Sequence, residues 1–144
     1  KRNESSFKAL ELGLKEAISK YYDLYKNEDC EFIKSFPKQI EFSSSWFVKM
    51  QSGGHLTSHI HEDGWISGAI YLSIPKKTKT QDEGAIELST HGDDYPIIND
   101  DFPKKVIKPK EGDVIFFPSS VFHRTIPFES DEERICIAFD LKPS

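Results

Sequence analysis

Apolar residues follow two different periodicities along the chain, and the change between them falls near residue 40. Across 6–26 they recur at the spacing of one face of an α-helix. From residue 41 onward, short apolar or alternating runs are separated by clusters of Gly, Pro, Asn and Asp, which is typical of strands and turns. The pattern therefore predicts one amphipathic helix, whose apolar stripe packs on a sheet, followed by a β-rich region.

The β-rich region contains enough short strands for a closed or sandwiched β fold. Two polar stretches, 75–84 and 90–103, are expected to form loops between strands. A length of 144 residues is typical of one domain, so we expect 1–144 to be a single domain, with 1–40 as helical support and 41–144 as β core. The predicted strands span 45–51, 56–61, 65–74, 85–89, 105–108, 113–117, 121–126 and 134–141.

Charge and composition exclude several classes of partner. Lys and Arg total 19 against 24 Asp and Glu, and the two signs are interspersed, so nucleic acid is not expected as a partner. No apolar run approaches the ~20 residues that a membrane span needs, and no signal peptide is evident. Cys30 and Cys136 lie outside any paired motif and are expected to be reduced thiols. We expect a cytoplasmic protein with no membrane partner. Because the sequence begins without Met, further domains can lie outside it.

Three histidines are candidate metal ligands. His59 and His61 stand at i and i+2, which on a strand places both imidazoles on one face. His123 lies in another predicted strand, 121–126, and can join them if the two strands are neighbours. Three protein ligands leave coordination positions open, as a catalytic metal requires.

The same segment offers a second ligand set. His61, Asp63 and His123 would form the two-histidine, one-carboxylate triad of non-heme iron oxygenases. Asp63 directly precedes Gly64, however, and in that position it is more typical of a turn residue. A three-histidine zinc site would also fit the spacing, so the metal stays open on pattern alone.

Arg134 is a candidate anion-binding residue. It is the first residue of the last predicted strand, 134–141. An Arg side chain that points into an apolar interior needs an anion, such as a carboxylate, that can accept hydrogen bonds from its guanidinium. A dicarboxylate cosubstrate would meet this need. The alternative is a surface Arg paired with Glu132 or Glu133, and the pattern leaves both interpretations open.

Taken together and in order, these motifs resemble the 2-oxoglutarate- and Fe(II)-dependent oxygenases of the small bacterial and phage type. The resemblance covers 46–141. The motifs that carry it are Trp46 with Gly53 and Gly54, the His59-Ile60-His61 motif, the segments 66–72 and 112–119, and His123 with Arg134.

The resemblance implies a fold and a set of roles. The fold would be a double-stranded β-helix, a mainly β, cupin-like jelly roll, with one N-terminal helix packed on the sheet. Iron(II) would bind His59, His61 and His123, since the family pattern is H-x-H rather than H-x-D. Arg134 would hold the far carboxylate of 2-oxoglutarate, and Tyr71 would be a second contact to it, unless its role is core packing.

Two details qualify these expectations. Cys136 stands where related oxygenases commonly carry a Ser two residues after the arginine, and a thiol is a weaker donor. An apolar lining around the metal is expected from the strand residues Ile70, Leu72, Ile115 and Phe117.

The expected function is therefore that of a hydroxylase-type dioxygenase that uses molecular oxygen. Its substrate would be a small molecule or a protein side chain. A second hypothesis is a cupin-like metal-binding protein or enzyme that does not use 2-oxoglutarate, and a third is a non-enzymatic β-sandwich interaction module. Arg134 distinguishes the first hypothesis from the second.

Overall fold

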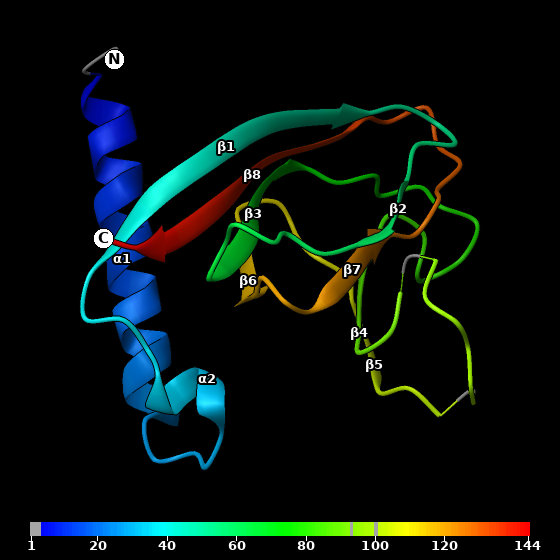
Figure 1. Ribbon diagram of the computed structural model, residues 1–144. Coiled ribbons are helices and arrows are strands. Elements are labelled where there is room, and N and C mark those ends of the chain that lie inside the picture. The colour runs from blue at the N-terminus through cyan, green and yellow to red at the C-terminus, as the bar shows by residue number, and fades with distance from the viewer. Residues whose placement is uncertain (1–3, 93, 100) are drawn as a thin grey trace. The chain divides into compact units, whose positions relative to one another are not determined.

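The computed structural model describes residues 4–92, 94–99 and 101–144. The chain divides into two compact units, one that ends at Lys38 and one that spans Gln39–Ser144. The first unit contains the helices α1 (Ser5–Tyr25) and α2 (Glu31–Lys34). The second contains β1 (Ile40–Met50), β2 (Leu56–His59), β3 (Ile66–Ser73), β4 (Ile86–Ser89), β5 (Lys104–Ile107), β6 (Val114–Pro118), β7 (Phe122–Thr125) and β8 (Arg134–Pro143), as labelled in Figure 1.

The predicted helix is confirmed as α1, which begins and ends within one residue of the predicted range. The helix α2 was not predicted, because four residues are too few to display a period. The rings of Tyr22 and Phe36 contact each other, with centroids 4.9 Å apart, and thereby connect the last turn of α1 to the chain after α2. No helix in the described part of the chain is long and apolar enough to span a membrane. The packing of α1 on a sheet and the single domain stay predictions.

Two four-stranded sheets make up the second unit. Their strand orders are β1-β8-β3-β6 and β2-β7-β4-β5, and neighbouring strands pair antiparallel (Figure 1). Each predicted strand corresponds to one observed strand. The prediction of a mainly β, double-stranded β-helix is confirmed, since alternation of apolar and polar positions is what two facing sheets impose on each strand.

Three strand boundaries differ from those predicted by two residues or more, and one of them is the end of β8, which lies at Pro143 rather than at residue 141. β1 begins at Ile40 rather than at residue 45, because the segment before residue 45 pairs with the end of β8. β2 ends at His59, so His61 lies beyond the strand rather than within it. A common strand therefore does not explain how His61 comes to lie near His59.

Gly68 lies in β3 between β6 and β8, where the neighbouring strands leave no room for a side chain. A Cβ atom there would lie 2.6 Å from the carbonyl oxygen of Ile115 and 2.7 Å from Cζ of Phe139. We expect Gly68→Ala to lower the free energy of unfolding by about 1–3 kcal/mol, because an overpacked site forces its neighbours to shift. Urea denaturation of the purified chain measures this change.

The matched control for this prediction is Gly13→Ala. Gly13 lies within α1, and an added Cβ there meets nothing within 4 Å. Alanine favours a helix interior over glycine by up to about 1 kcal/mol, so this variant should gain stability. Equal loss of stability in both variants would contradict the close approach at Gly68.

Candidate metal centre

His59 and His123 are brought together by strand pairing. They are directly opposite each other in the antiparallel pair β2–β7. Side chains of opposed residues lie on the same face and close together. Their ring centroids are accordingly 4.2 Å apart.

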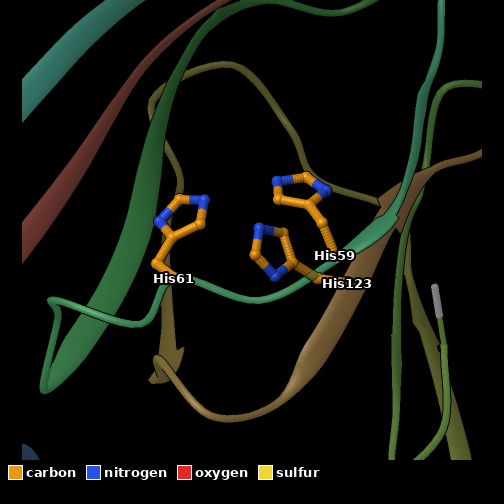
Figure 2. A group of neighbouring side chains, drawn as sticks. All are labelled: His59, His61 and His123. Atoms are coloured by element: carbon orange, nitrogen blue, oxygen red, sulfur yellow. The ribbon is translucent and has the colours of Figure 1, made fainter. Parts of the chain in front are cut away.

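His61 completes the group from the segment that follows β2. Its ring centroid lies 5.2 Å from that of His59 and 4.9 Å from that of His123. One ligand atom from each of the three residues lies within 4.8 Å of the others, and Figure 2 shows the rings turned toward a common space. An ion about 2.1 Å from each nitrogen needs separations of roughly 3–4 Å, and the three ligand atoms lie within 4.8 Å of one another.

Hydrogen bonds determine which nitrogen each ring offers to a metal. Nδ1 of His59 donates to the carbonyl oxygen of Thr57 at 2.7 Å, and Nδ1 of His123 donates to that of Val121 at 3.2 Å. Nδ1 of His61 donates to a carboxylate oxygen of Asp140 at 2.6 Å. These acceptors carry no proton, so the neutral rings must carry theirs on Nδ1. Each Nε2 therefore keeps a lone pair for coordination.

His123 is held in the neutral form that binds metals. Its side chain is buried and its ring contacts that of Phe117, with centroids 4.7 Å apart. Burial, followed by the proximity of His59, lowers the pKa of His123 to about 4. At pH 7 the ring is thus uncharged and needs no deprotonation before it binds an ion.

Asp63 lies outside this group. It is exposed and occupies the turn after His61, which matches its interpretation as a turn residue. Among the residues that the structure describes, the grouped ligand atoms are those of His59, His61 and His123. The arrangement therefore favours His59 over Asp63 as the third ligand.

Arg134 is buried and lacks a carboxylate partner among the described residues. It is 3% exposed, and its Nε donates to the carbonyl oxygen of Gly84 at 2.9 Å. It also contacts the sulfur atoms of Met50 and Cys136, at 4.0 and 3.8 Å, and the side chain of Tyr71. A buried cation without a counter-charge is costly, so this guanidinium calls for an anion.

The surface alternative for Arg134 is wrong, because its two candidate partners bind elsewhere. Glu133 forms an ion pair with Lys49 at 2.8 Å, and Glu132 accepts from the backbone N–H of Lys76 at 2.6 Å. Both are surface interactions of the segment before β8. Glu132 and Glu133, which suggested a surface ion pair, therefore do not neutralise the guanidinium of Arg134.

Tyr71 lies beside Arg134 in the interior. Cζ of Arg134 is 5.1 Å from the centroid of the Tyr71 ring. Burial raises the pKa of Tyr71 to about 12, although the neighbouring guanidinium opposes part of this shift. The phenol therefore stays protonated and keeps a hydrogen-bond donor beside the guanidinium.

These residues line a common cavity of about 250 Å³. Its walls come from both sheets, and they include the three histidines, Arg134 and Tyr71. Of the four apolar residues expected to line it, Phe117 does so, whereas Ile70, Leu72 and Ile115 are not among its lining residues. Other apolar residues that line the cavity are Val48, Ile86, Ala69 and Ala138.

Asp140 is a site residue that the sequence motifs missed. Its buried carboxylate accepts hydrogen bonds from His61 Nδ1 and from the hydroxyl of Ser67, both at 2.6 Å. The signal for it was present in the alternation along β8. Asp140 is an even number of residues from Arg134 and Cys136 along β8, so its carboxylate lies on the same strand face as the buried guanidinium of Arg134.

Comparison with protein families identifies a match over most of the β region. A family model described as "Putative 2OG-Fe(II) oxygenase" matches residues 44–140. This range includes the three histidines, Tyr71, Arg134 and Asp140. No curated protein matches the sequence.

Solved structures share the fold at low sequence identity. A prolyl-4-hydroxylase from Pseudomonas putida aligns with a TM-score of 0.60 and 15% identity, over 100% of this chain and 69% of its own. A 2OG-Fe(II) oxygenase family oxidoreductase from Burkholderia pseudomallei aligns at 0.56 and 15%, over 76% of this chain. HygX from Streptomyces hygroscopicus, solved with iron bound, aligns at 0.55 and 10%, over 78% of this chain and 62% of its own. The chain spans about half the Burkholderia protein, 48% of its length.

Proposed function

Because the chain belongs to the 2-oxoglutarate- and Fe(II)-dependent oxygenase family, we propose that it is a hydroxylase of this class. The observation that carries the proposal is the arrangement of three imidazoles with every Nδ1 bonded to an acceptor, in one cavity with a buried, unmatched guanidinium. Imidazole suits iron as well as zinc, copper and nickel, so the choice of iron follows from the family.

The proposed ligands are His59, His61 and His123, each through Nε2. The donor set fits a divalent ion, since each ring bonds an acceptor through Nδ1 and leaves Nε2 for coordination. Iron(II) with 2-oxoglutarate supplies the oxidation chemistry, in which molecular oxygen is consumed and the cosubstrate is decarboxylated to succinate. Three protein ligands leave positions for the cosubstrate and for oxygen.

Arg134 and Tyr71 are the proposed cosubstrate ligands. A carboxylate at the inner end of the cavity would neutralise the guanidinium and accept charge-assisted hydrogen bonds from it. The Nε of Arg134 is already bound to Gly84, which holds the guanidinium in place before the anion arrives. Orientation of the cosubstrate relative to the histidines would follow from this clamp.

The apolar walls of the cavity would keep water from the reacting carbon. Val48, Ile86 and Phe117 contribute such surface. Trp46 also lines the cavity and is 44% exposed, so it stands where the cavity meets solvent. We propose a small molecule or a protein side chain as the substrate that enters there.

Anaerobic titration tests the proposal. The full chain mixed with Fe(II) and 2-oxoglutarate should develop a visible absorption band that neither ligand produces alone. Admission of oxygen should then yield succinate, and a chelator added beforehand should suppress it. Absence of both the band and succinate would argue strongly against the proposal.

A further inference from the structure

A buried carboxylate lies directly behind one of the three imidazoles. Asp140 is 5% exposed and its Oδ1 accepts the Nδ1 proton of His61 at 2.6 Å. The hydroxyl of Ser67 donates to the same oxygen at 2.6 Å, and Ser67 and Ser119 share a hydrogen bond at 2.8 Å. The hydroxyl of Ser44 lies 3.5 Å from the other carboxylate oxygen.

The carboxylate has no Lys or Arg partner within 4–92, 94–99 and 101–144. Its one ionic contact there is with His61, which is uncharged when its Nε2 offers a lone pair. A buried carboxylate without a counter-charge is unfavourable. A cation bound at Nε2 of His61 would compensate the negative charge of Asp140 through the imidazole ring. Hydrogen bonds from uncharged serine hydroxyls do not supply a counter-charge.

The position of His61 depends on the same network. His61 lies beyond β2, yet its backbone N–H donates to the carbonyl oxygen of Ser119 at 3.2 Å. The turn that follows is packed tightly, since a Cβ on Gly64 would lie 2.4 Å from the hydroxyl oxygen of Ser119 and 3.5 Å from Cβ of Asp140. Backbone and side chain of His61 are thus both anchored beside Asp140.

We propose that Asp140 is a positioning residue that orients His61 and lends the metal centre the negative charge that three neutral imidazoles lack. In the two-histidine, one-carboxylate triad a ligand brings this charge to the metal directly. Here the carboxylate acts from the far side of an imidazole and makes its Nε2 a stronger donor. The inference rests on the proposed function, because it requires that a metal binds the three histidines.

Asp140→Asn separates charge from shape. The amide keeps an oxygen that can accept from His61 but removes the negative charge. With Co(II) as a probe that resists oxidation, we expect the Kd of the full chain to rise about 10- to 100-fold. Ser44→Ala is the matched control, since it removes the hydroxyl that lies 3.5 Å from the other carboxylate oxygen and keeps the charge of Asp140. That variant should stay within a few-fold of the unchanged protein.

The melting temperature of each metal-free variant is measured in parallel. The inference would be overturned if Asp140→Asn bound Co(II) as tightly as the unchanged protein. This holds even if the variant melts at a lower temperature, because loss of stability without loss of metal affinity indicates a purely structural residue. If the unchanged chain itself fails to bind Co(II) at the histidines, the proposed function fails too. If Asp140→Asn and the unchanged chain both bind Co(II) tightly, the proposed role of Asp140 is wrong but the proposed function still stands.

A second measurement needs no variant. In the Zn(II)-loaded protein, the Nδ1–H proton of His61 should resonate further downfield than those of His59 and His123. The reason is that His61 donates to a carboxylate, whereas the other two donate to backbone carbonyls. Equal chemical shifts for all three protons would overturn the inference.

Discussion

Replacement of His123 by alanine is expected to abolish iron(II) binding. Loss of a group that merely orients a ligand already lowers metal affinity about 10- to 100-fold, so loss of a ligand should exceed ~100-fold. His123 is also the buried member that faces both other imidazoles. Isothermal titration of the metal-free chain with Fe(II) under anaerobic conditions measures the effect.

Two control variants accompany this prediction. His55→Ala removes an exposed imidazole whose Nδ1 bonds to the carbonyl of Gly53, outside the cavity. Asp63→Asn removes the carboxylate of the alternative triad. Both variants should bind iron(II) as the unchanged chain does. Loss of binding in Asp63→Asn, with His59→Ala unaffected, would instead support His61, Asp63 and His123 as the ligands.

Arg134→Met should weaken 2-oxoglutarate binding at least ~30-fold and leave metal binding intact. Removal of one partner of a buried charge pair costs roughly 2–5 kcal/mol, and 1.4 kcal/mol corresponds to a tenfold change. Methionine fills a similar apolar volume without the donors. Because the variant also removes a buried cation that lacks a carboxylate partner in the described chain, its ligand-free form should melt no lower than the unchanged protein.

Arg124→Met is the matched control. Arg124 lies on β7, is exposed, and forms a two-pronged ion pair with Glu87 at 2.9 Å. Its loss should leave 2-oxoglutarate affinity unchanged. If Arg134→Met binds the cosubstrate normally while His123→Ala loses the metal, the chain is a cupin-like metal protein that does not use 2-oxoglutarate.

Alternation and turn residues were sufficient to predict the strands. Each predicted strand has a counterpart because two facing sheets require the period-two pattern that the sequence displays. The N-terminal boundary of β1 was missed, although Ile40 and Phe42 alternate with polar residues, because pairing with β8 extends the strand through 40–44. Pairing between distant strands is a tertiary property that local pattern does not contain.

The candidate site was predictable in part. His59 and His123 were singled out by residue type, and their direct opposition in β2–β7 explains why the two imidazoles lie close together. His61 does not lie in the predicted strand, and its contacts with Ser119 and Asp140 hold it beside the other two histidines instead. Asp140 escaped prediction because its partner is 79 residues away in the chain, which no motif spacing encodes.

Arg134 shows a different limit. From the sequence, the interior and the surface interpretations were both open, because the neighbouring glutamates offered a plausible pairing. Burial decides between them. The side chain of Arg134 is 3% exposed, Glu132 binds the backbone N–H of Lys76, and Glu133 pairs with Lys49. The direction in which the first residue of a strand points depends on the strand's partners, and β8 lies between β1 and β3.

Anomalous diffraction at the iron edge, from crystals soaked anaerobically with Fe(II) and 2-oxoglutarate, tests the central claim most directly. The account predicts one peak about 2.1 Å from Nε2 of each of the three histidines, with the far carboxylate of the cosubstrate on Arg134. A peak bound by Asp63, or none among His59, His61 and His123, would contradict it.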